Sequence, residues 1–199
     1  EDAEAKANVN QMREAEARAV AALCQRLIGS YRLQVERDDP LVRPGDIVLI
    51  DRDCHKSHHY GLVLAGGQPY YIDAYPLTQY SMYGSVPIRP IKEALLKLKA
   101  EGKLEKARLL VLTNCTFDGH VANCKRTMEE CLAIKPDLIF LWDEAWYGYA
   151  RFTPFLRRRS GLGAAALLDE QLRDPEYRKR YEAFKAQAGD LDPGNTKLL

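Results

Sequence analysis

Three polar clusters follow short apolar runs in the sequence, and they hold most of the residues that could do chemistry. They are DRDCHKS at residues 51–57, TNCTFDG at residues 113–119 and DEAW at residues 143–146. Their carboxylates, imidazole, thiol and lysine are the groups that serve enzymes as acids, bases and nucleophiles. In open parallel sheets, ligands bind outside the carboxyl ends of the strands. Clusters at three such ends therefore predict one shared site.

A metal centre is the first chemistry to weigh for these residues. The possible ligands form two sets, Cys54, His55, His58 and His59, and then Cys115, His120 and Cys124. Neither set has the paired spacing of a structural zinc site, and adjacent histidines point about 100° apart on a helix. We therefore expect no metal site.

Other chemistries fit the clusters less well than an organic cofactor does. The run LIFLWDE at residues 138–144 has the form of a magnesium-holding strand, but no GxxxxGK[ST] phosphate loop occurs in the 199 residues. A thiol nucleophile at Cys54 would need a histidine that meets it in space, and sequence neighbours such as His55 rarely do so. By contrast, a strand-end carboxylate, Asp143, can pair with a protonated ring nitrogen while His55 stacks on the ring face.

The bulk composition excludes several classes of protein. The chain is 46% hydrophobic and 29% charged, with a formal net charge of +1, which is ordinary for a soluble globular domain. This charge gives no global attraction to nucleic acid or to an anionic membrane. No stretch approaches about 18 uninterrupted apolar residues, and no signal-peptide region is visible. The five cysteines are an odd and unevenly spaced set, so we expect reduced thiols in a cytoplasmic protein.

Alternating short apolar runs and helix-period segments predict the elements that position the clusters. Expected strands, rich in Val, Ile, Leu or aromatic residues, lie at residues 46–50, 69–72, 107–112 and 137–142. Expected helices lie between them at residues 55–65, 88–103 and 123–134. This alternation predicts an α/β fold with a mostly parallel sheet flanked by helices.

The composition divides the chain into three parts. Residues 1–40 are rich in Ala, Glu, Arg and Gln and predict an amphipathic helix suited to packing or dimer formation. Residues 41–160 hold the α/β pattern. Residues 161–199 predict a charged helical connecting segment, with helix-forming stretches at 170–172 and 176–188.

The three clusters, in this order and at this separation, resemble the large domain of the pyridoxal-phosphate-dependent ornithine, lysine and arginine decarboxylases. The resemblance covers roughly residues 41–160. It implies the aspartate aminotransferase type of fold, pyridoxal 5′-phosphate as cofactor, an amino acid as substrate, and a homo-oligomer with sites at its interface.

The resemblance also implies roles for individual residues. His55 would stack on the pyridine ring, Asp143 would pair with the ring nitrogen, and Ala145 would pack against the opposite face. Trp146 would line the pocket, and Thr116 is the polar residue expected to shape its wall. A carboxylate beside the nitrogen keeps it protonated, so that the ring can accept the electrons released as carbon dioxide leaves.

Two parts of the family pattern are missing from the sequence. The cofactor lysine belongs to a Ser-x-His-Lys motif after the DEAW element, and the phosphate-binding turn is a Gly-Thr-Ser-like stretch before the strand near residue 46. Neither occurs, so we expect both to lie outside this chain. Lys56 does not replace this lysine. A stacking histidine and the cofactor lysine approach the ring from opposite sides, which the consecutive residues His55 and Lys56 cannot do.

Two functions remain open at this point. In the first, the chain is part of a decarboxylase of ornithine, lysine or arginine. In the second, it is a non-catalytic binding or assembly domain that keeps the fold.

Overall fold

The computed structural model describes residues 42–191, which fall into two compact units. Residues 42–46 and 55–68 belong to the first unit, and residues 47–54 and 69–191 to the second. The helix expected over residues 1–40 lies outside the described residues.

The first unit contains helix α2 (Lys56–Ala65). The helix begins after His55, whose side chain accepts a hydrogen bond from the backbone N–H of Ser57. It ends at Gly66, which adopts a left-handed φ of 69° that a residue with a side chain would rarely tolerate. The predicted helix at residues 55–65 is therefore confirmed to within one residue.

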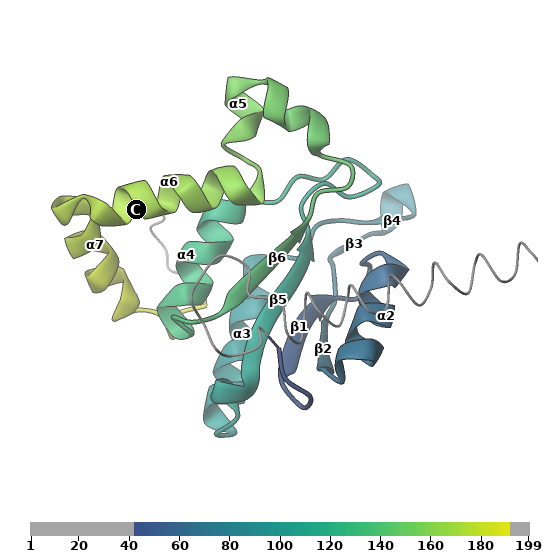
Figure 1. The fold of residues 1–199 in the computed structure, drawn as a ribbon, viewed down its shortest axis with the longest axis horizontal. Coiled ribbons are helices and arrows are strands. Elements are labelled where there is room, and N and C mark those ends of the chain that lie inside the picture. Colours follow the sequence, from purple (N-terminus) through teal and green to yellow (C-terminus); the bar gives the residue numbers. More distant parts are fainter. Residues whose placement is uncertain (1–41, 192–199) are drawn as a thin grey trace, which may run out of the picture. The chain divides into compact units, whose positions relative to one another are not determined.

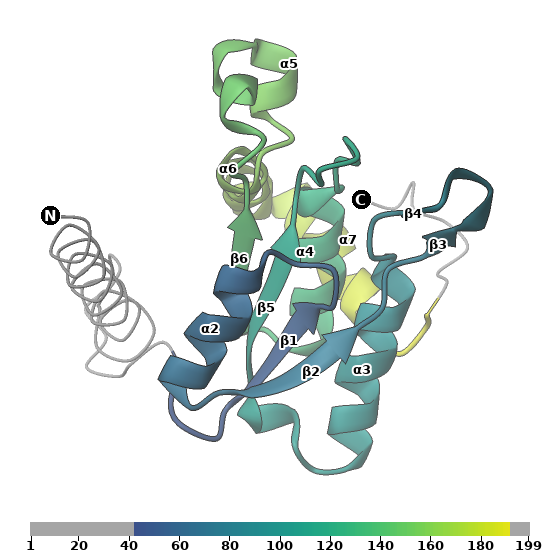
Figure 2. The same ribbon diagram turned by 90° about the vertical axis from the view of Figure 1, so that its right-hand side faces the viewer.

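The second unit is built on a four-stranded sheet in the order β2-β1-β5-β6 (Figures 1 and 2). The strands are β1 (Ile47–Asp51), β2 (Gln68–Ile72), β5 (Ala107–Thr113) and β6 (Ile139–Asp143). β1 pairs with β5, and β5 with β6, in parallel. All four strands lie where the apolar runs predicted them, and the mostly parallel sheet flanked by helices is confirmed.

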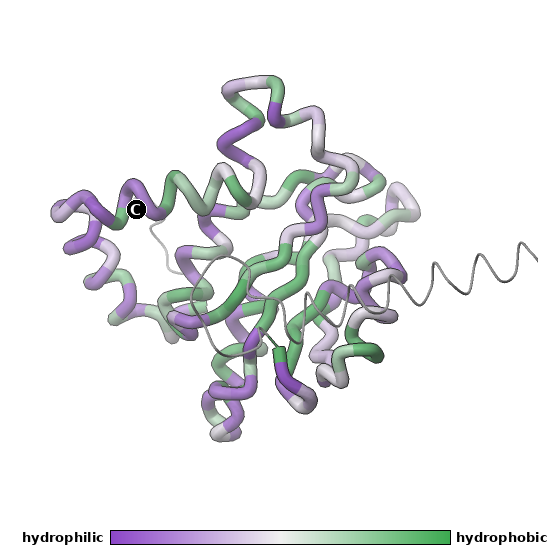
Figure 3. The backbone as a smooth tube through the Cα atoms, viewed as in Figure 1, coloured by the Kyte–Doolittle hydropathy of each residue, from purple (hydrophilic) through white to green (hydrophobic). Residues whose placement is uncertain are grey.

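Helices α3 (Ile88–Ala100) and α4 (Cys124–Ile134) share one apolar core with the sheet. Figure 3 shows the strands of the sheet mostly in green, whereas α3, α4 and α7 carry more purple. The core side chains include Ile47, Leu49, Ile72, Ile91, Leu95, Leu98, Leu110, Leu112, Cys131, Ile134 and Leu138. α3 is three residues shorter than predicted, because the chain turns at Gly102, whose φ is 68°.

Two further helices, α6 (Gly161–Arg173) and α7 (Pro175–Lys185), follow the sheet. α6 packs on α4 through Ala164 and Leu168, which share a core cluster with Met128 and Tyr177. Both helical stretches predicted within residues 161–199 are thus confirmed, whereas the three-part division of the chain stays a prediction.

The remaining elements are short. They are β3 (Pro76–Leu77) and β4 (Met82–Tyr83), which pair in an antiparallel manner, the 3₁₀ turns η2 (Thr78–Tyr80), η3 (Leu104–Lys106) and η4 (Gly148–Phe152), and α5 (Pro154–Arg157). Elements of two to five residues show no hydrophobic period, so the sequence did not predict them.

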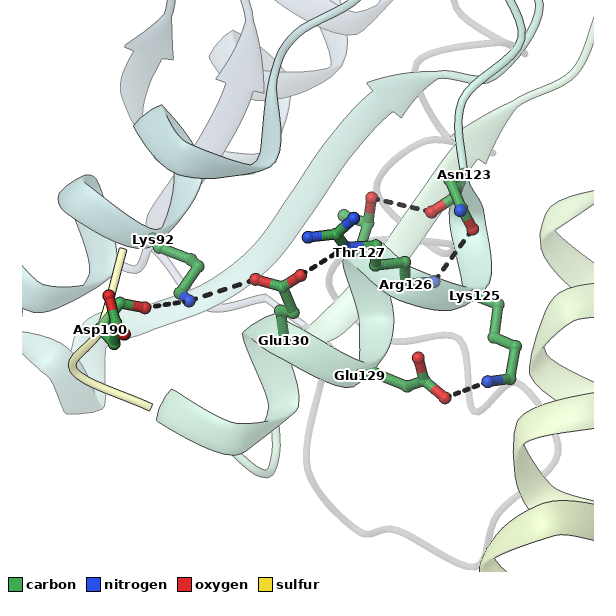
Figure 4. Close-up of polar contacts among 8 residues, drawn as sticks. All are labelled: Lys92, Asn123, Lys125, Arg126, Thr127, Glu129, Glu130 and Asp190. Atoms are coloured by element: carbon green, nitrogen blue, oxygen red, sulfur yellow. Dashed lines mark hydrogen bonds and ion pairs between the residues drawn. The ribbon is translucent and has the colours of Figure 1, made fainter. Parts of the chain in front are cut away.

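A buried ion-pair network joins α3, α4 and the segment after α7 (Figure 4). Lys92 is fully buried, and its Nζ lies 3.1 Å from Oε2 of Glu130. The same ammonium donates to the carbonyl oxygen of Asp190, while Arg126 Nε donates to Oε1 of Glu130 at 2.6 Å. The buried carboxylate therefore has two cationic partners, as a buried charge requires.

None of the helices within residues 42–191 is long and apolar enough to cross a membrane. The four cysteines in that range, Cys54, Cys115, Cys124 and Cys131, are free thiols.

Candidate functional site

The carboxyl ends of β5 and β6 lie directly side by side. Thr113 is paired in register with Asp143, and the backbone N–H of Asn114 donates to the carbonyl oxygen of Asp143 at 3.0 Å. The parallel arrangement thus brings the second and third polar clusters to one edge of the sheet. This confirms the prediction that these two clusters meet.

Asp143 is the last residue of β6, and the turn that follows it orients its carboxylate. The backbone N–H of Ala145 donates to Asp143 Oδ1 at 3.1 Å. Trp146 is 62% exposed, and its ring meets that of Phe117 edge to face, with centroids 5.4 Å apart. The turn after β6 and the loop after β5 therefore contact each other through aromatic rings.

Thr116 stabilises the loop after β5 by two hydrogen bonds to one residue. Its N–H donates to the carbonyl oxygen of His120 at 3.0 Å, and its Oγ1 accepts from the N–H of His120 at 3.1 Å. Gly119 completes the turn with a φ of 84°. These bonds give Thr116 a structural function in the loop, and its contact with a cofactor stays a prediction.

Glu144 holds the strand ends to the start of α6, a contact that sequence reasoning missed. Its Oε1 accepts from Nδ2 of Asn114 at 2.5 Å and from the N–H of Gly161 at 2.6 Å. Asn114 is fully buried, and it also donates to the carbonyl oxygen of Arg159 and accepts from the N–H of Ala122. One carboxylate and one amide thus tie together four backbone segments. The polar types at the strand ends were the only signal in the sequence.

Gly161 is required where α6 passes over β6. A Cβ atom at this position would overlap the Trp142 side chain, including its own Cβ atom. The close approach explains how the N–H of Gly161 reaches Glu144. Ser160 caps the helix, since its Oγ accepts from the N–H of Gly163 at 3.0 Å.

The end of β1 carries a carboxyl group in a buried position. Asp51 is only 5% exposed, and its Oδ1 accepts from the N–H of Asp53 at 2.9 Å. Loss of solvation on burial raises the pKa of Asp51, and the charges of Asp53 and Asp73 raise it further. Burial and the neighbouring carboxylates thus favour the neutral form of Asp51 more than in a solvated aspartate.

Cys54 follows the end of β1 and is partly buried. Burial, and after it the charge of Asp51, raises the pKa of the Cys54 thiol to about 11, and Asp143 contributes to the same shift. A thiol with so high a pKa is a poor nucleophile at neutral pH.

His55 follows Cys54 in the chain and belongs to the other compact unit. Its Nδ1 accepts from the N–H of Ser57 at 3.3 Å and lies 2.9 Å from the Ser57 hydroxyl oxygen. An acceptor at Nδ1 leaves the proton of the neutral imidazole on Nε2. Lys56 is the exposed first residue of α2, and His58 and His59 lie on that helix as predicted. The approach of His55 to Asp143 stays a prediction.

Buried polar atoms gather near the ends of β5 and β6. Among the described residues, Thr113 Oγ1, His120 Nε2, Trp142 Nε1 and Tyr147 Oη are buried and have no hydrogen-bond partner within the chain. Such atoms are few in native proteins, and each one calls for an explanation such as a functional role or a bound water or ion. Thr113 is the register partner of Asp143. A planar, polar cofactor beside Asp143 is compatible with this arrangement.

Comparisons with known proteins identify the family of the chain. Residues 39–175, more than half of the chain, match a family model described as "Orn/Lys/Arg decarboxylase, major domain". Biodegradative arginine decarboxylase of Escherichia coli K12 is 40% identical over 119 residues, 55% of this chain and 15% of that protein. Inducible ornithine decarboxylase of the same strain is 33% identical over 157 residues, 75% of this chain and 20% of that protein.

A third relative extends the set to lysine. Lysine decarboxylase LdcA of Pseudomonas aeruginosa is 31% identical over 126 residues, which cover 60% of this chain and 16% of that protein. The chain thus spans at most about a fifth of the length of these three relatives. The match of residues 39–175 shows that the chain belongs to the ornithine/lysine/arginine decarboxylase family.

Proposed function

We propose that the chain is part of a pyridoxal-phosphate-dependent decarboxylase that acts on ornithine, lysine or arginine. The observation that carries the proposal is the carboxylate of Asp143, which ends the parallel strand β6 opposite Thr113, whose buried hydroxyl has no hydrogen-bond partner within the described residues. The three relatives named above, decarboxylases of arginine, ornithine and lysine by name, support the substrate class. When bound, pyridoxal phosphate supplies a ring that accepts the electron pair released as the carboxylate leaves.

The residues of this chain would hold and tune that ring. Asp143 would accept a hydrogen bond from the ring nitrogen and favour its protonated form, as an opposite charge does for any base. His55 would cover one face of the ring and Ala145 the other. Trp146 and Thr116 would line the surrounding wall, with the Trp146 ring braced by its edge-to-face contact.

The covalent anchor of the cofactor belongs outside residues 1–199 in this proposal. The sequence holds neither a Ser-x-His-Lys motif after residue 146 nor a glycine-rich turn before β1. Lys56 is exposed at the start of α2 and is next to the residue proposed to stack on the ring. We therefore assign it no bond to the cofactor.

Titration with pyridoxal phosphate tests the role of Asp143. We expect Asp143→Asn to weaken binding about tenfold, because it removes the charge that pairs with the ring nitrogen, a difference of about 1.4 kcal/mol. Asp137→Asn is a matched control, since Asp137 precedes the same strand at its opposite end. Tryptophan fluorescence can report binding, because Trp146 would lie near the ring. Equal affinities of the two variants would refute the assignment.

Borohydride reduction followed by peptide mass spectrometry tests the position of the anchor. After incubation with pyridoxal phosphate, we expect no specific adduct on any lysine of residues 1–199. A single stoichiometric adduct on Lys56 would show that the anchor has been assigned wrongly.

Assembly is the second function that an observation favours. Phe152, Phe155 and Leu162 are 85%, 69% and 77% exposed, and they lie close together in the sequence after β6. Large apolar side chains in such a group are typical of contact with another protein surface. We propose a cytoplasmic homo-oligomer. Light scattering would measure the number of subunits in the wild type and in Phe152→Ser. If pyridoxal phosphate does not bind, assembly or binding without catalysis becomes the better account of the chain.

A further inference from the structure

A cavity of about 340 Å³ opens at the carboxyl ends of β1 and β2. Arg52 and Asp53 come from the loop after β1, Asp73 and Ala74 follow β2, and the rest of the wall comes from the β3 and β4 pair. The volume lies at the lower end of the range for small-molecule pockets. The cavity thus has the size for a single amino acid or amine.

The charged groups of the cavity are arranged asymmetrically. Arg52 Nε donates to Asp73 Oδ1 at 2.5 Å, and the guanidinium lies 4.8 Å from the centre of the Tyr71 ring. Asp53 also lines the cavity, and its carboxylate forms no hydrogen bond or ion pair within residues 42–191. The charge of Asp73 is therefore compensated by Arg52, whereas the carboxylate of Asp53 is available to a ligand.

The charged side chains around the cavity favour a cationic ligand. The charges of Asp53 and Asp73 both raise the pKa of the buried Asp51, after the larger effect of its own burial and against the hydrogen bond from the N–H of Asp53, so three carboxylates lie in this region. Arg52 supplies one positive charge among them. A ligand with a positive end would reduce this repulsion, and the Tyr83 ring and the apolar Ala74 and Pro76 offer contacts for an aliphatic stem.

The cavity shares an edge of the sheet with Asp143. In the order β2-β1-β5-β6, only β5 separates β1 from β6, so the ends of those two strands are about 10 Å apart. Ligands of open parallel sheets bind along this edge. A long side chain that starts near the end of β6 could thus extend toward the end of β1.

We propose that this cavity binds the ammonium or guanidinium end of a basic amino acid, with Asp53 as the carboxylate that pairs with it. Asp73 holds Arg52 against the wall, and Ala74, Pro76 and Tyr83 contact the methylene groups. That the ligand is the substrate of the decarboxylase rests on the proposed function. The cavity itself is defined by residues of this chain alone.

Titration of the ¹⁵N-labelled chain with L-lysine and L-arginine, without any cofactor, tests this proposal. L-norleucine and L-citrulline are the matched probes, since they keep the stem and lack the charge. We expect the amide signals of Asp53, Asp73 and Tyr83 to shift with the charged amino acids. We expect the neutral probes to bind at least about fivefold more weakly, the factor set by one exposed ion pair.

Asp53→Asn should weaken the binding of L-lysine by the same factor of about five. Asp169→Asn is the control, because it removes an equal charge from α6, outside the cavity. Equal binding of charged and neutral probes, an unchanged affinity in Asp53→Asn, or no shifts at tens of millimolar L-lysine would each overturn the proposal. These outcomes are independent of the pyridoxal phosphate titration, so failure of one account can be told from failure of the other.

Discussion

Replacing Glu144 tests whether one carboxylate holds the strand ends to α6. Its Oε1 accepts from Asn114 Nδ2 at 2.5 Å and from the N–H of Gly161 at 2.6 Å. Glu144→Ala leaves both donors without this acceptor, and Asn114 is fully buried. A buried donor that loses its partner costs about 1–3 kcal/mol, and bonds to a charged group lie at the upper end of that range. We expect the free energy of unfolding to fall by about 3 kcal/mol.

Urea denaturation followed by circular dichroism measures this loss of free energy. In thermal unfolding, the same loss lowers Tm by about 6–12 °C for a chain of this size. Glu144→Gln is the matched control, because its amide oxygen still accepts one hydrogen bond, and it should cost only about 1 kcal/mol. A loss below about 1 kcal/mol in the alanine variant, or equal losses in the two variants, would refute this account of Glu144.

Three further predictions concern packing, buried charge and pH. Gly161→Ala should lower the free energy of unfolding by about 2 kcal/mol or more in a denaturant titration, because its methyl group overlaps the side chain below, whereas Gly148→Ala meets open space and should be nearly neutral. Lys92→Met should cost about 2 kcal/mol, because the buried Glu130 then keeps only Arg126 as a cationic partner, and replacing Glu130 by Leu as well should restore part of that loss. If Lys92→Met alone unfolds no more readily than the wild type, the account of the buried ion pair is contradicted. Alkylation of Cys54 should rise about tenfold per pH unit up to about pH 11, since only the thiolate reacts and burial raises its pKa. A rate that levels off near pH 8.5 would show an unperturbed thiol.

The sequence predicted the sheet well because β1, β5 and β6 are mostly apolar runs bounded by polar residues. β5 and β6 were found within one or two residues of their bounds, and the polar residues that follow them were correctly expected to meet. Helices with a long apolar period, such as α4, were equally clear.

Contacts between residues distant in the chain could not be predicted in this way. Glu144 meets Asn114 across 30 residues and Gly161 across 17, and nothing in their local sequence identifies the partners. The cavity likewise depends on Arg52 and Asp73, which are 21 residues apart and come together only because β1 and β2 are neighbours. Topology, rather than composition, determines these contacts.

The protonation state of the cofactor's ring nitrogen tests the central claim most directly. ¹⁵N NMR of labelled pyridoxal phosphate bound to the chain would report it at a pH where the nitrogen of the free cofactor is neutral. If Asp143 pairs with the ring, the bound nitrogen stays protonated in the wild type and loses its proton in Asp143→Asn. The same neutral signal in both proteins would contradict the assignment of this carboxylate, and with it the proposed site at the end of β6.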